Sequence, residues 1–164
     1  MTIRRWRTSS YAVRNDLLAL AFALVVLCLG GGAEESLPKF LGVGFPVLLA
    51  SVQVVAVRRP LAAAMLFAVA AGGLEDALSS LPPMTSVSFF MLAMAFARRA
   101  DLPHAATLLT YPAYQIWLAA WTGGLGGGVF GRILVSLPIG AVTAFAVGWA
   151  ICIAERRVAL GEQG

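Results

Sequence analysis

The sequence predicts an all-helical membrane protein, a single bundle of about six transmembrane helices with both termini in the cytoplasm. Three observations predict it. Apolar residues make up 60% of the 164 residues and charged residues only 12%, and mean hydropathy is +0.85. A soluble domain usually carries about 25% charged residues. The apolar residues form long runs rather than alternating with polar ones, which favours helices over a barrel. The basic residues gather in short clusters between these runs.

The runs can be placed one by one, because a helix that crosses a bilayer needs roughly 20 mostly apolar residues. Pro82 and Pro83 separate the third run from the fourth, since proline lacks the backbone donor and clashes with the preceding turn. The whole chain, residues 1–164, is therefore expected to form one integral membrane domain. Its predicted spans are 17–32, 40–57, 61–80, 84–97, 105–122 and 132–154.

The arginines then predict the orientation of this layout. Of the twelve basic residues, only Lys39 and Arg132 fall on one side, and the other ten fall on the opposite side. Cytoplasmic loops carry the excess of Lys and Arg, so both termini are expected in the cytoplasm and the protein in the inner membrane. Topology also explains the net charge of +4 without nucleic-acid binding. Four acidic residues fall towards the outer side: Glu34, Glu35, Glu75 and Asp76.

No pattern in the chain is typical of catalysis, a cofactor or a metal. The single histidine, His104, is expected in a cytoplasmic loop, across the bilayer from Asp76. No cluster of His, Cys and Glu has metal-ligand spacing, and no serine lies in a nucleophile elbow. Cys28 and Cys152 are expected near opposite faces of the bilayer, too far apart for a disulfide. We therefore expect no catalytic residue, no cofactor and no metal site.

The acidic pair Glu75–Asp76 is the first candidate site, because ionisable residues inside a membrane are usually functional. At helical spacing Gly72, Asp76 and Ser80 share one face, and Glu75 points about 100° away. Asp76 is then expected to face a neighbouring helix, where it binds a partner or makes a structural hydrogen bond, and Glu75 to reach the headgroups. The alternative is that both carboxylates lie passively in the wet interface.

Small residues at intervals of four form the second set of candidates, since they allow close helix contact in lipid. Gly140, Ala144 and Gly148 recur in this way on the sixth span, and Ala19 and Ala23 on the first. Packing within the bundle is favoured over a surface for a partner helix.

The stretch after the third span resembles a known family. Its residues Gly72, Gly73, Leu74, Asp76, Ser79, Ser80 and Pro83-Met84 resemble the motif of the rod shape-determining MreD family. That family typically has a glycine-rich third helix with an aspartate, a Ser/Gly turn and a Pro-Leu-Gly-like start of the next helix. Thr85 stands where the family usually has glycine.

The resemblance implies the six-helix bundle that MreD is thought to share with substrate-binding components of energy-coupling-factor vitamin transporters. It also implies a non-enzymatic role in bacterial cell elongation. The partners would be an MreC-like protein, an MreB-like filament and the enzymes that synthesise side-wall peptidoglycan. The candidate structural or partner-binding residues are Gly72, Gly73, Asp76, Ser79, Ser80 and Pro83; the candidate helix-packing residues are Ala19, Ala23, Gly140, Ala144 and Gly148.

A transporter's substrate-binding component is the alternative, because the fold would be the same. Such a protein needs a pocket near the outer face, where polar groups converge among aromatic ones. The spacing Ala19-x-x-x-Ala23 resembles the docking motif of these components. A membrane scaffold with neither role is a third possibility. The pocket could be lined by Glu75, Asp76, Tyr111, Tyr114, Gln115, Trp117 and Trp121.

Overall fold

The described residues of the computed structural model are 10–39, 43–79, 81–123 and 128–161, with side chains described from Ala23 to Ile153 within those ranges. Six helices make up most of these residues, which confirms the predicted all-helical class. The helices are α1 (Ser10–Ser36), α2 (Val47–Arg58), α3 (Leu61–Leu78), α4 (Thr85–Ala100), α5 (Pro103–Trp121) and α6 (Gly128–Gly161). Two segments, Leu61–Leu78 and Gly128–Ile153, are long and apolar enough to cross a membrane by length and composition.

The helix α2 is shorter than the run that predicts it. The run begins at residue 40, but the helix begins at Val47, directly after Pro46. The Val47 amide donates to the carbonyl oxygen of Phe45 at 2.8 Å, so the chain turns there before the helix starts. With 12 residues, α2 is about 18 Å long. That is well short of the roughly 30 Å of a bilayer's hydrocarbon core.

Two other helices are longer than their predicted spans. The helix α1 begins at Ser10 rather than at residue 17, and α6 runs from Gly128 to Gly161 rather than from 132 to 154. The length of an apolar run reflects the thickness of the lipid that it must cross. A helix can continue beyond that run into polar residues. The break at Pro82 and Pro83 lies between α3 and α4, as predicted.

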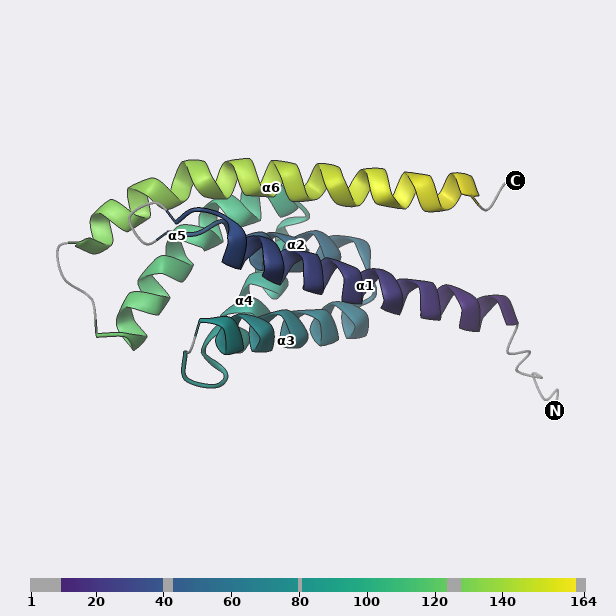
Figure 1. Ribbon diagram of the computed structural model, residues 1–164, viewed down its shortest axis with the longest axis horizontal. Coiled ribbons are helices and arrows are strands. Elements are labelled where there is room, and N and C mark those ends of the chain that lie inside the picture. Colours follow the sequence, from purple (N-terminus) through teal and green to yellow (C-terminus); the bar gives the residue numbers. More distant parts are fainter. Residues whose placement is uncertain (1–9, 40–42, 80, 124–127, 162–164) are drawn as a thin grey trace.

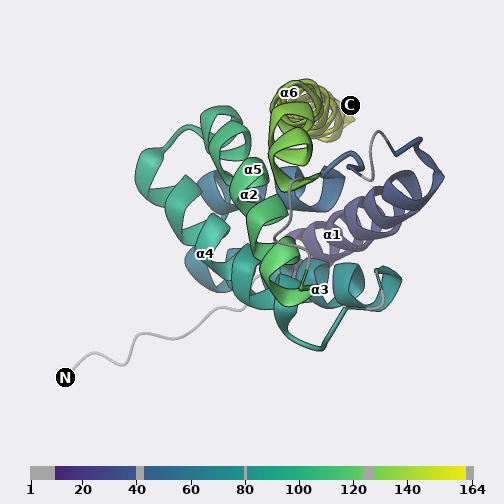
Figure 2. The ribbon, with the colours of Figure 1, turned by 90° about the vertical axis from the view of Figure 1, so that its left-hand side faces the viewer.

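The short helix α2 lies at the centre of the bundle and packs against all five other helices (Figures 1 and 2). The helices α3 and α4 form one closely packed pair, and α5 and α6 form another. The start of α1 and the end of α6 lie at the same end of the molecule (Figure 1). Arg98, at the end of α4, donates from Nη1 to the carbonyl oxygens of Ala56 and Arg59 at 3.1 and 2.9 Å. This contact joins the turns after α2 and α4, which we call the arginine end (Arg58, Arg59, Arg98 and Arg99).

The interior of the bundle is mostly apolar but includes polar side chains, and large apolar side chains also cover its surface. Gln53 of α2 is fully buried; it accepts a hydrogen bond from Thr107 and donates one to Thr110 at 2.5 Å. By contrast, Leu66 and Phe145 are 74% and 73% exposed. In water an extended apolar surface of this kind would be a liability, whereas in lipid it is matched to its solvent. The distribution supports membrane association.

Candidate functional site

The motif residue Gly72 lies where α3 and α4 touch. A Cβ atom at Gly72 would come within 2.5 Å of Val87 Cα and 2.7 Å of Val87 N. These are backbone atoms, so no rotation of a side chain could relieve the overlap. Glycine at this position therefore lets the two helices approach until their backbones are in contact.

Asp76 lies one turn further along the same face of α3 and caps the next helix. Its side chain is only 8% exposed, and its Oδ1 accepts a hydrogen bond from the Ser86 amide at 2.7 Å. Met84, at the N-cap of α4, makes no side-chain capping bond. Asp76 therefore satisfies one of the free amide groups at the start of α4, where the helix dipole is positive. Its Oδ2 and Thr85 Oγ1 are buried without a hydrogen-bond partner among the described residues.

The other motif residues lie away from this contact. Gly73 is exposed, and a Cβ atom there would meet nothing within 4 Å. Ser79 is exposed and donates from Oγ to Glu75 Oε1 at 3.1 Å, and Pro83 is exposed in the connecting turn. Ser80 falls outside the described residues. The structure thus brings together Gly72 and Asp76 of the predicted set, but not Gly73, Ser79 or Pro83.

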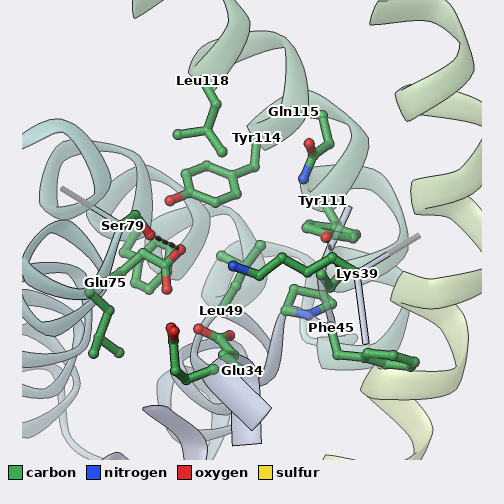
Figure 3. Close-up of a pocket in the computed structure, with 15 residues that line it drawn as sticks. Glu34, Lys39, Phe45, Leu49, Glu75, Ser79, Tyr111, Tyr114, Gln115 and Leu118 are labelled. Atoms are coloured by element: carbon green, nitrogen blue, oxygen red, sulfur yellow. Dashed lines mark hydrogen bonds between the residues drawn. The ribbon is translucent and has the colours of Figure 1, made fainter. Parts of the chain in front are cut away.

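A pocket lies at the end of the bundle opposite the arginine end. It has a volume of about 160 Å³ and lies between the ends of α1 and α3, the residues directly before α2, and α5. Three carboxylates and one ammonium group line it, beside polar and apolar walls. We call it the acidic pocket (Figure 3); its lining is Glu34, Glu35, Lys39, Gly44, Phe45, Pro46, Leu49, Glu75, Leu78, Ser79, Phe90, Tyr111, Tyr114, Gln115 and Leu118.

Glu34 connects this pocket to the start of α2. Its Oε1 accepts a hydrogen bond from the Leu48 amide at 2.7 Å, although Glu34 belongs to α1. Pro46, at the N-cap of α2, has no side-chain acceptor for the free amide groups of the helix, so Glu34 of α1 provides that acceptor. Glu34 lies beyond the predicted span 17–32. Its burial raises the pKa of its carboxyl group well above the usual value, and the nearby carboxylate of Glu75 raises this pKa further.

Glu75 lines the acidic pocket. The roughly 100° that separate it from Asp76 on α3 turn it towards α1, where Glu34 lies. Residues of α5 form the opposite wall. The hydroxyl of Tyr111 donates to the carbonyl oxygen of Gly44, and the hydroxyls of Tyr114 and Ser86 share a hydrogen bond of 2.6 Å.

Of the seven residues predicted to line a pocket, four do so: Glu75, Tyr111, Tyr114 and Gln115. The Asp76 side chain does not line the pocket but hydrogen-bonds to the start of α4. The indole of Trp117 donates to the carbonyl oxygen of Thr85 at 3.1 Å, and its ring packs against those of Phe89 and Trp121. Sequence reasoning missed the roles of Glu34 and Lys39. The signal that could have found Glu34 is a helix start at Pro46-Val47 without a local capping side chain, since another segment must then provide the acceptor.

The small residues of α6 face α5, within the bundle. Gly140 lies beneath Tyr111, where a Cβ atom would be 3.2 Å from Cδ1 of the ring, and Ala144 is buried. A Cβ atom at Gly148 would come within 2.2 Å of His104 Cε1. Ala23 packs against the core from α1, and the side chain of Ala19 falls outside the described residues.

His104 is not in a loop, as the sequence analysis expected, but in the first turn of α5. Pro103, at the helix start, favours helix continuation from that point rather than breaking it. The Nδ1 atom of His104 is 3.0 Å from the carbonyl oxygen of Ala144, and its ring packs against Phe145. His104 therefore contributes to the contact between α5 and α6. Cys28 and Cys152 are free thiols.

Comparison with known proteins finds no match. No family model, curated protein or solved structure matches the chain. What the molecule can do must therefore be inferred from its own geometry. Within the described part of the chain, no group of three His, Cys, Asp or Glu side chains is arranged to hold a metal ion. The geometry offers a tightly joined helix pair, an acidic pocket and broad apolar surfaces.

Proposed function

We propose that this protein is a non-enzymatic, multi-pass inner-membrane subunit of the bacterial cell-elongation machinery, related to the MreD family. In this proposal all six helices belong to the membrane domain and both termini are cytoplasmic. The chain acts by binding partner proteins in the membrane. The partners are an MreC-like protein, an MreB-like filament and the enzymes of side-wall synthesis.

One observation carries the proposal. The motif residues that resemble MreD, Gly72 and Asp76, join α3 to α4 by a backbone contact and a helix cap. They do not line the acidic pocket. A motif that fixes the shape of two helices is suited to a protein that presents surfaces, since its residues need not touch a ligand.

The surfaces available for partner helices are apolar and exposed. Leu66 of α3, Leu92 of α4 and Phe145 of α6 are each more than three-fifths exposed. An MreC-like transmembrane helix could pack on such a face by van der Waals contact. The arginine end would face the cytoplasmic partners.

The test is a pair of neighbouring glycine variants in a rod-shaped host whose own copy of the gene is depleted. G72A places a Cβ atom against the Val87 backbone, so we expect it to separate α3 from α4 and fail to restore rod shape. G73A meets open space and should restore it. Both variants lose one glycine from the same helix, so their difference reports the α3–α4 contact. The measurement is cell shape, with membrane abundance of each variant checked by immunoblot.

A pull-down of the tagged wild-type protein in mild detergent, analysed by mass spectrometry, tests the partners directly. Recovery of cell-elongation proteins agrees with the proposal. Rod shape that persists after depletion, together with a pull-down that lacks these proteins, would contradict it.

The acidic pocket favours a second candidate, the substrate-binding component of an energy-coupling-factor transporter. Tyr111, Tyr114 and Gln115 converge with Glu75 there, as such a role requires. However, pockets for ligands the size of a drug or cofactor usually measure about 300–1,000 Å³. At about 160 Å³ the pocket is small for a vitamin. Recovery of a transporter's transmembrane and ATP-hydrolysing subunits in the same pull-down would favour this candidate.

A further inference from the structure

The acidic pocket has a charge pattern that the proposed scaffold role does not use. Glu34, Glu35 and Glu75 line it, and among the described residues Lys39 is the one cation in its lining. Three carboxyl groups against one ammonium group leave an excess of negative charge at the pocket, even when Glu34 carries its proton. A charge excess of this kind in a partly enclosed site favours a cation and opposes an anion.

Two of these carboxyl groups come from separate helices and hydrogen-bond to one another, Glu34 from α1 and Glu75 from α3. Glu34 Oε1 also accepts from the Leu48 amide, and Glu75 Oε1 accepts from the Ser79 hydroxyl. A carboxylate has about four acceptor positions, so both groups can accept further donors. A cation between them could take the place of the proton that they share and would offset the repulsion between the two ionised groups.

Lys39 gives an independent observation about the chemistry that fits the pocket. Its side chain extends across the pocket, and its ammonium end points towards Glu75 (Figure 3). Lys39 comes from the segment after α1 and is otherwise exposed. The chain therefore directs its own primary ammonium group into the space between α1, α3 and α5.

The remaining walls set the size and shape of a ligand. Leu49, Phe90 and Leu118 supply apolar surface, and the Gln115 amide, in a side chain that is 6% exposed, supplies a neutral polar group. About 160 Å³ corresponds to roughly five water molecules at ~30 Å³ each. The space thus suits a short organic amine whose carbon chain contacts the apolar side.

We propose that the acidic pocket binds a small primary ammonium ion, and that the ammonium group of Lys39 occupies the same position when the ligand is absent. This inference does not depend on the function proposed above. The ammonium group could come from a free amine or from the headgroup of phosphatidylethanolamine, which share this chemistry.

Thermal unfolding of the purified full-length chain in detergent tests the proposal, with propylamine hydrochloride as the probe. A ligand that binds only the folded state raises the melting temperature. We expect propylamine to raise it by about 3 °C or more. Propanol, which has the same shape without the charge, and sodium propionate, which has the opposite charge, should leave it unchanged at equal ionic strength.

Variants assign the effect to the pocket. K39Q removes the internal competitor and should tighten propylamine binding about tenfold if Lys39 occupies the position nine-tenths of the time. The double variant E34Q/E75Q should lose the response. D101N is the matched control, because Asp101 is an exposed carboxylate in the α4–α5 turn, and should respond like wild type.

An equal shift with propanol, or unchanged propylamine binding in K39Q, would overturn the proposal. K39Q tests the proposal even if E34Q/E75Q fails to fold. Lys39 is exposed, so its replacement should not disturb the fold. Ethanolamine and phosphatidylethanolamine in mixed micelles then separate the two sources. A shift with ethanolamine identifies a free amine, and a shift with the lipid alone identifies the headgroup; a shift with neither contradicts the proposal.

Discussion

Asp76 shows how a single acidic side chain can join two neighbouring helices. It belongs to α3 but satisfies an amide group of α4. The 3.6-residue period of the sequence was enough to predict that Gly72 and Asp76 share a face. It could not predict what that face touches, because the identity of the neighbouring helix depends on the tertiary fold.

We expect D76A to lower the free energy of unfolding by about 1–2 kcal/mol, because the Ser86 amide would lose its acceptor at the start of a helix. D76N keeps an acceptor oxygen and should cost less. S79A, which changes an exposed hydroxyl at the C-cap of the same helix, should have little effect. Chemical denaturation in detergent measures all three. Equal losses in D76A and D76N would indicate that the charge, rather than the acceptor, stabilises α4.

Glu34 could not be found from local sequence, because the helix it caps begins 13 residues later. Its pKa is raised by burial and by Glu75, and Lys39, Glu35 and Tyr111 also face it in the pocket. A carboxyl group whose pKa is higher in the folded state than in the unfolded state stabilises the fold most while both states are protonated. That stability is lost as pH rises through the folded-state pKa.

E34Q stays neutral at every pH and keeps the acceptor for Leu48. We therefore expect the melting temperature of E34Q to exceed that of wild type at pH 8, and the difference to shrink as pH falls to 5. Melting curves across this range provide the measurement, with D101N, which changes an exposed carboxyl group in the α4–α5 turn, as the control. A difference that stays constant with pH would show that ionisation of Glu34 does not limit stability.

At the scale of elements, the sequence predicted that the chain is helical but not where each helix begins. Apolar runs locate helices reliably, because lipid and core both select the same side chains. The start of the predicted span 40–57 was placed too early. Residues 43–46 are apolar enough to belong to a span, but Gly44 and Pro46 disfavour helix. The spacing of Gly140, Ala144 and Gly148 predicted a packing face, and α5 occupies that face.

The α5–α6 contact can be tested through His104 and Gly148. G148A should force the His104 ring off its position and weaken its contact with the Ala144 carbonyl, which destabilises the fold. In the double variant G148A/H104A the space is restored, so the two losses should be less than additive. Thermal unfolding of the four proteins in the cycle measures the coupling.

G131A is the matched control for this cycle, since a Cβ atom there meets nothing within 4 Å. Glycine within a helix costs roughly 0.5–1 kcal/mol relative to alanine, so G131A should be neutral or stabilising. Additive losses from G148A and H104A would show that the ring and the glycine do not depend on one another.

At the scale of the whole molecule, a cluster of arginines and a cluster of carboxyl groups lie at opposite ends. The arginine end lies at the ends of α2 and α4, and the acidic pocket lies near the start of α2. The basic clusters in the sequence predicted this polarity through the proposed six-span layout, which puts them on one side. The sequence also predicted four residues of the pocket wall, but it could not predict Glu34 and Lys39, whose positions depend on how α1 packs beside α2 and α3.

This polarity predicts a labelling pattern in intact cells. In a background with Cys28 and Cys152 replaced by alanine, S79C should react with a membrane-impermeant maleimide added outside. A100C, which is exposed beside the arginine end, should react only after the cells are opened. Reaction of A100C in intact cells would reverse the proposed orientation.

In the proposed topology, the shortness of α2 has an electrical consequence in an energised bilayer. Membrane voltage falls across the region that excludes water, and a pocket open to water at one end of a helix about 18 Å long would shorten that region. The field along α2 would then be steeper than along the longer helices beside it. A cation that enters the pocket from outside crosses part of this voltage, worth up to about 2.3 kcal/mol per 100 mV for a complete crossing. Occupancy of the pocket would therefore rise when the cell interior becomes more negative.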